Sequence, residues 1–62
     1  MSDRWVKCTD LNGKPSYINL SEAVTIQSKM SGGEVVSTVI LFQRASTEVK
    51  ETPEQILSLK AL

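Results

Sequence analysis

The stretch Val35 to Phe42, V-V-S-T-V-I-L-F, decides the fold of this chain. It is the densest apolar run in the sequence, and it follows Gly32-Gly33, a pair that is typical of a turn. Valine, threonine, isoleucine and phenylalanine favour pleated, packed surfaces, and a short apolar run after a turn signal indicates a strand rather than a helix. We therefore predict a strand that begins at Val35 and ends near Gln43.

The second half of this run is apolar on both faces of the predicted strand. Alternation places Val39 and Leu41 on one face and Ile40 and Phe42 on the other. A sheet with one solvated face would alternate apolar and polar residues instead, so both faces need cover. The cover is either the far wall of a barrel or another subunit. The four residues are therefore our candidate oligomer interface.

The size and composition of the chain favour self-association. Its 62 residues make one domain, residues 1–62. A domain this short buries only about 60% of its unfolded surface and is marginally stable alone. One cysteine and no histidine exclude an internal disulfide and a Cys/His zinc site. We expect no cofactor and no metal, and oligomerisation is the remaining common source of stability.

The charge balance and the N-terminus bear on partners and location. Seven basic residues match seven acidic residues, whereas binders of nucleic acids and membrane surfaces usually carry a basic excess. No apolar run approaches the roughly 20 residues that span a bilayer. The first residues, M-S-D-R-W, lack a signal-peptide pattern, and the unpaired Cys8 fits a reducing compartment. We expect a cytoplasmic protein.

Four further strands are predicted from alternation and turn signals; they cover residues 4–9, 15–20, 23–30 and 47–51. Asn12-Gly13 predicts a type I′ hairpin turn, and the loop from Ser31 to Glu34 predicts another hairpin. In the third strand we expect one inward face, and in the last an inward Val49. The inward face of the third strand consists of Val24, Ile26, Ser28 and Met30.

The end of the chain predicts a short helix. Thr52 stands at the N-cap, Pro53 at the first helical position and Gln55 three residues after the cap. A helix of barely two turns must be held by packing, and it can cover only one face or end of a sheet. The fold class is therefore mainly β, a four- to five-stranded antiparallel meander or small barrel with a short C-terminal helix.

Two aromatic and two basic residues form a second candidate surface. Trp5 and Tyr17 can share a face across the first hairpin, with Lys7 and Lys14 nearby. Bases of single-stranded nucleic acid stack on such rings while lysines meet phosphates. The same rings also serve as a cross-strand packing pair. The zero net charge favours packing or an oligomer contact, and nucleic-acid binding is the alternative.

No residue pattern indicates an enzyme. Cys8 has no histidine to activate it, and its strand position predicts a buried thiol that behaves as a small apolar residue. Glu48, Glu51 and Glu54 lie close in sequence, but they flank a strand and begin a helix, so we interpret them as structural. We predict no catalytic residues.

Short motifs in this order resemble those of the small FlbD-type bacterial proteins. They are L-N-G at 11–13, Y-I-N-L at 17–20, the strand ending at Ile26, and V-K-E-T-P-E-Q-I at 49–56. The sequence differs from that pattern in having Trp5 in the first strand and S-G-G-E at 31–34. The resemblance implies a bacterial source and a role related to flagellar motility, and it supplies no catalytic residues. Together with the apolar run, it gives our main hypothesis, a non-enzymatic, self-associating protein-interaction module.

Overall fold

The computed structural model describes residues 3–62 and contains five strands, one 3₁₀ turn and one α-helix. In chain order the elements are β1 (Trp5–Thr9), β2 (Pro15–Asn19), η1 (Leu20–Glu22), β3 (Thr25–Ser31), β4 (Glu34–Leu41), β5 (Ser46–Val49) and α1 (Pro53–Ser58). The predicted fold class, mainly β with a short C-terminal helix, is confirmed. None of the described helices is long and apolar enough to cross a membrane.

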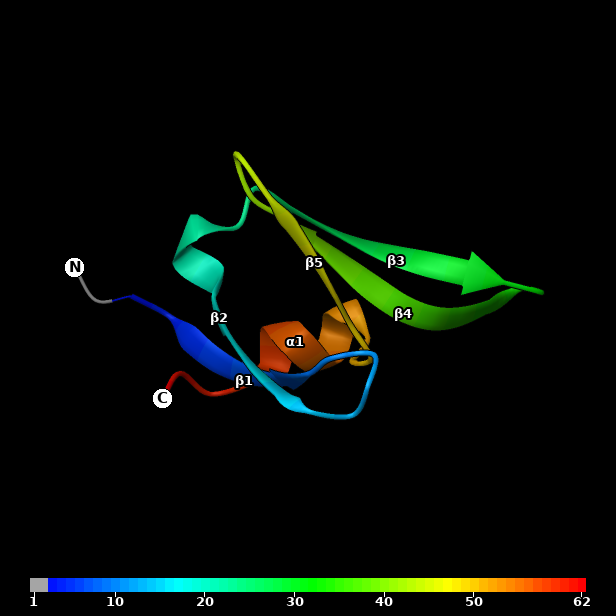
Figure 1. The fold of residues 1–62 in the computed structure, drawn as a ribbon, viewed down its shortest axis with the longest axis horizontal. Helices are drawn as coiled ribbons and strands as arrows, with labels where there is room; N and C mark the ends of the chain where they lie inside the picture. The colour runs from blue at the N-terminus through cyan, green and yellow to red at the C-terminus, as the bar shows by residue number, and fades with distance from the viewer. Residues whose placement is uncertain (1–2) are drawn as a thin grey trace.

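The strands form two antiparallel sheets. β1 pairs with β2, and the second sheet has the order β3-β4-β5, so β4 is its central strand. Figure 1 shows the two sheets on either side of a shared interior, with α1 beside it. An isolated bridge between Asp10 and Val49, and a hydrogen bond from Lys50 N to Thr9 O at 2.8 Å, join the sheets at one corner. Over residues 3–62 the strands do not close into a barrel.

The loop between β1 and β2 differs from the predicted type I′ turn. Such a turn needs a positive φ at Asn12, but the positive φ angles of the described chain are confined to glycines, here Gly13 at 86°. Asp10 organises the loop instead. Its Oδ1 accepts hydrogen bonds from the backbone N–H groups of Asn12 and Lys14, both at 2.9 Å. The side chain of Asp10 therefore stabilises a longer loop that the Asn-Gly pair alone did not indicate.

The predicted β3–β4 hairpin is present, and its turn has two residues. Ser31 pairs with Glu34, and the intervening Gly32 and Gly33 have φ angles of 60° and 82°. Two positive φ angles are what a type I′ turn requires, and glycine adopts them without strain. The register shifts between Lys29 and Met30, which marks a β-bulge near the tip.

The core lies between the two sheets and α1. β1 contributes two alternate side chains, and β2, β4, β5 and α1 contribute one each. The buried apolar residues are Val6, Cys8, Ile18, Ile40, Val49 and Ile56. The inward Val49 confirms the sequence prediction for this position, and Ile18 pairs directly with Val6. The core is small, because β3 supplies only the half-buried Ile26 to it.

The third strand corrects an expectation. We predicted that Val24, Ile26, Ser28 and Met30 face the interior, but Ile26 alone is half-buried and the other three are exposed. β3 is an edge strand, and its C-terminal half extends past the opposite sheet. The alternation of apolar and polar residues in this half therefore does not indicate which side chains are buried, because no second layer covers them. The strand also begins at Thr25 rather than Ala23, and β4 ends at Leu41, before Phe42.

The helix start is as predicted. Thr52 Oγ1 accepts from Gln55 N at 3.1 Å, and Gln55 Oε1 accepts from Thr52 N at 2.9 Å, which completes a capping box. At the other end, the Arg4 guanidinium donates to the carbonyl oxygens of Leu57 and Leu59, at 2.8 and 3.2 Å. Both ends of α1 are therefore tied down by side chains, and Ile56 anchors it to the core.

Candidate functional site

The four residues of the predicted oligomer interface have different environments. Ile40 is enclosed in the core of a single chain, so its side chain meets the opposite sheet and helix. Val39 and Leu41 lie on the outer face of β4 and are half-buried by their neighbours. Phe42 lies just after the strand and packs against the core. Contact with a second copy stays a prediction for Val39, Leu41 and Phe42.

The outer face of the three-stranded sheet carries polar groups beside β4. Ser37 is buried, and its hydroxyl donates to Glu48 Oε2. Glu48 also lies 3.7 Å from Lys29 Nζ across the sheet. These side chains flank Val39 and reduce the apolar area on this face. The sequence pattern missed this, because the partners come from three different strands.

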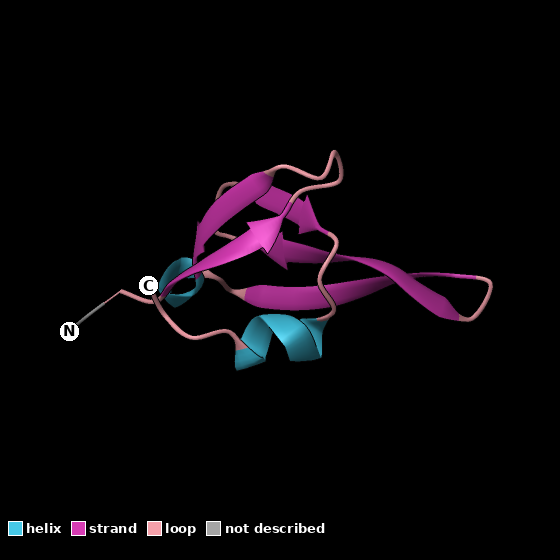
Figure 2. Ribbon diagram, turned by 90° about the horizontal axis from the view of Figure 1, so that it is seen from below, coloured by secondary structure: helices cyan, strands magenta, loops and turns pink. Residues whose placement is uncertain are grey.

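An uncovered apolar surface lies instead on the β3–β4 hairpin tip, residues 29–36, which we call the arm. Figure 2 shows the arm extending beyond the rest of the molecule, and it gives the chain its 40 × 22 × 20 Å shape. Met30 and Val35 are direct cross-strand partners and are 59% and 41% exposed, while Val36 is 52% exposed. The pairing of β4 with β5 stops at Thr38, so the part of β4 between the hairpin turn and Thr38 has no partner strand on that side. Because β3 is an edge strand, the arm is open along both β3 and β4.

The sequence pattern predicts strands for these residues but does not identify them as surface. A usable signal was present in the lengths. The predicted third and fourth strands are longer than the other predicted strands. In the structure they have seven and eight residues, whereas the strands available to cover or extend them have four or five. The excess length has to project from the body, and its side chains have no opposite layer to pack on.

A mainly apolar pocket of about 320 Å³ lies at the other end of β3, between η1, β3 and α1. Its apolar lining consists of Leu20, Ala23, Val24, Ile26 and Leu57. Val24 and Leu57 are 65% and 58% exposed, so the pocket is open to a partner. Arg4 also lines it, but the guanidinium is already engaged by α1 carbonyl groups. We call this the β3–α1 pocket.

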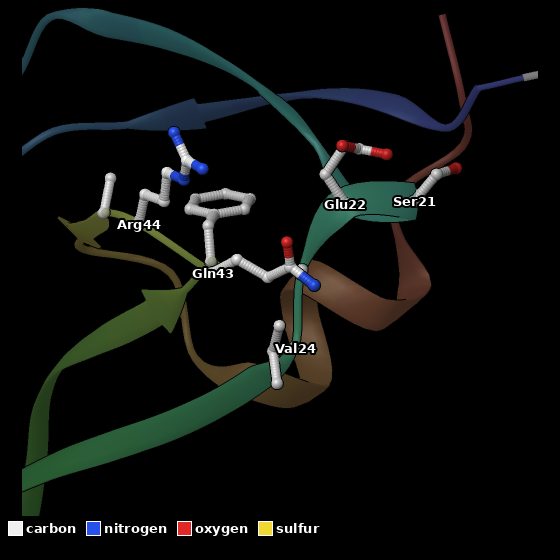
Figure 3. Close-up of a pocket in the computed structure, with 8 residues that line it drawn as sticks. Ser21, Glu22, Val24, Gln43 and Arg44 are labelled. Carbon is white, nitrogen blue, oxygen red and sulfur yellow. The ribbon is translucent and has the colours of Figure 1, made fainter.

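A larger open pocket, of about 520 Å³, lies between the segments 21–24 and 42–45. Figure 3 shows Glu22 and Arg44 on opposite sides of it, with Gln43 and Val24 between them. Ser21 supplies a hydroxyl, but its oxygen accepts a hydrogen bond from Arg4 N at 2.9 Å. The pocket thus presents one cation and one anion around an open hollow, with no nucleophile paired to a base among its lining residues.

Cys8 has the environment of an inert thiol. Burial, assisted by the negative charge of Glu51, raises the pKa of Cys8 above its ordinary value. A thiol held in its protonated form is a poor nucleophile. Glu51 itself has a structural partner, because its Oε1 accepts from Thr9 N at 2.8 Å. Glu54 lies in the first turn of α1, so the three glutamates do not form an acid–base pair.

The aromatic and basic candidates come together in part. Lys7 is directly opposite Tyr17, and Trp5 is one alternation away on the same outer face of the β1–β2 hairpin. The two rings are 45% and 57% exposed. Lys14 lies in the loop before β2, and its backbone N–H is bonded to Asp10. The structure therefore confirms that Trp5, Lys7 and Tyr17 share an exposed face.

Over residues 3–62 no group of three or more histidine, cysteine, aspartate or glutamate side chains is arranged to hold a metal ion. No protein family, curated protein or solved structure matches the chain.

Proposed function

We propose that this chain is a non-enzymatic protein-interaction module that works by self-association. The observation that carries the proposal is the arm, which exposes Met30, Val35 and Val36, whereas residues 3–62 bury a core of only six apolar residues. Burial of apolar area stabilises association by about 25 cal/mol per Å² before the costs of binding. A second copy of the chain is present wherever the chain itself is present, so self-association needs no other partner.

Sedimentation velocity over a range of concentrations tests this proposal. We expect the wild type to sediment as an oligomer at tens of micromolar. Met30→Lys should shift it towards the monomer, because the ammonium would be desolvated at the contact. Leu11→Lys is the matched control, since Leu11 is 50% exposed but lies on the β1–β2 loop. A wild type that stays monomeric at these concentrations would contradict self-association.

The alternative proposal is a sheet that binds single-stranded nucleic acid. It is supported by the exposed face that Trp5, Lys7 and Tyr17 share, with Lys14 at its loop end. Trp5 is the single tryptophan of the chain, so its fluorescence reports on this face alone. Titration with oligothymidylate at low salt should quench it, and added salt should reverse the quenching. Unchanged fluorescence through the titration would exclude this function.

We further propose a cytoplasmic, motility-related setting in a bacterium. The support is the resemblance of L-N-G at 11–13 and V-K-E-T-P-E-Q-I at 49–56 to FlbD-type proteins. The genes next to the one that encodes this chain provide the test. Flagellar genes should be found there, and neighbours with no link to motility would count against this setting.

A further inference from the structure

The two ends of β3 carry complementary features. Met30, near the C-terminal end, is a flexible side chain that is 59% exposed. The β3–α1 pocket, at the N-terminal end, is a mainly apolar hollow of about 320 Å³ lined by Val24, Ile26 and Leu57 among others. Methionine is suited to filling irregular apolar gaps. Within one chain the two cannot meet, because they lie at opposite ends of an extended strand.

A twofold axis brings them together. When two identical strands run antiparallel about such an axis, each end of one strand lies beside the opposite end of the other. The midpoint of Thr25–Ser31 is Ser28. An axis at Ser28 places Met30 of each copy opposite Ile26 of its partner, which lines the β3–α1 pocket together with Val24. The contact is then made twice, once at each end.

The charges of β3 are compatible with this arrangement. Lys29 is the charged residue of the strand, and an axis at Ser28 sets it opposite Gln27 of the partner. An axis at Lys29 would instead oppose two like charges, which is destabilising. Lys29 also has a carboxylate within its own chain, since Glu48 lies 3.7 Å from its Nζ. The charge of Lys29 therefore does not repel the β3 strand of a second copy.

We infer that two copies associate with their β3 strands antiparallel about an axis near Ser28, and that Met30 of each copy enters the β3–α1 pocket of the other. This inference rests on the proposed self-association and names its contact. Figure 2 shows that the tip of the β3–β4 hairpin projects beyond α1, and Met30, near this tip, is exposed. The pocket is bounded by α1 through Leu57, so the helix takes part in the contact rather than only closing the core.

A charge exchange between two variants tests the reciprocal contact. Met30→Glu places a carboxylate in the partner's pocket, and Val24→Lys places an ammonium beside it. Each variant alone should be monomeric at a concentration where the wild type is dimeric. An equal mixture should form a heterodimer, because one of its two contacts is Glu–Lys and the other is the native Met30–Val24. Leu11→Glu, which changes an exposed leucine outside the contact, should remain dimeric.

The outcomes separate this inference from the proposed function. A monomeric wild type would contradict self-association itself. A dimeric wild type whose Met30→Glu and Val24→Lys variants also stay dimeric would overturn the β3 contact and leave self-association standing. Monomeric variants that fail to associate on mixing would overturn the reciprocal geometry.

Cross-linking gives a second readout that does not depend on those variants. Ser28→Cys lies at the axis, next to its own symmetry mate, and a short bis-maleimide should join the two copies. Ser31→Cys is the matched control: three residues from the axis, it lies about 20 Å from its mate and should not cross-link. Both serines are exposed, and the buried Cys8 of the wild type provides the blank. Equal cross-linking of the two variants would overturn the axis position.

Discussion

Hydrogen bonds made by a few polar side chains fix the loop and the helix ends of this small fold. Asp10 shapes the β1–β2 loop, Thr52 and Gln55 begin α1, and Arg4 ends it. The Thr52 cap was predictable, because its partners lie within three residues. The roles of Asp10 and Arg4 were not. Asn12-Gly13 pointed to a different turn, and the carbonyl groups that Arg4 binds lie more than fifty residues away.

Glu51 makes the stability of the fold depend on pH. Burial acts to raise the pKa of Glu51, but hydrogen bonds that include the one from Thr9 N outweigh it, so the pKa lies below its ordinary value. A carboxylate whose pKa is lowered by folding contributes stability above its unfolded pKa and loses it as the pH falls through the folded value. Glu51 therefore stabilises the fold at neutral pH and less in acid.

We predict the effect from urea unfolding of the wild type and Glu51→Gln. The variant should be less stable at pH 7, and the difference should shrink as the pH falls through the ordinary glutamate pKa towards the lower folded pKa, below which Glu51 is protonated in both states. The urea midpoint at each pH measures this. A difference that stays constant from neutral to acid pH would contradict the role given to the carboxylate.

At the scale of elements, the C-terminal helix depends on one buried side chain. α1 has six residues, too few to be stable alone, and Ile56 is the member that reaches the core. The helix and its cap were predictable from local sequence. The face that it buries was not, because Ile56 and Leu57 are adjacent and equally apolar. The orientation comes from contacts with β3 and from Arg4 at the helix end.

The adjacent pair provides a matched test of that orientation. Ile56→Ala should lower the free energy of unfolding by about 2–5 kcal/mol, because it leaves a cavity in place of a fully buried side chain. Leu57→Ala should change it by less than about 0.5 kcal/mol, since Leu57 is 58% exposed. Chemical denaturation at the lowest workable protein concentration keeps association out of the comparison. Equal losses for the two variants would show that the helix is not anchored through Ile56.

At the scale of the whole molecule, the chain makes more strand than it can cover. The run of 35–42 indicated this, because both of its faces are apolar and the short C-terminal helix can cover only one face of a sheet. The structure resolves the problem at Ile40, which meets the other sheet and helix, and leaves it open further along the hairpin, at Met30 and Val36. The part of the β3–β4 hairpin that is covered depends on how far β1 and β2 overlap it. The alternation of apolar and polar residues along the sequence does not determine this overlap.

Association of two chains through this uncovered part doubles the mass of the particle, so the molar mass in solution is its most direct test. One chain has a mass of 6.8 kDa. Sedimentation equilibrium at tens of micromolar should return twice that mass, and dilution should lower it towards the single-chain value. A mass of 6.8 kDa at every concentration up to that range would contradict the account.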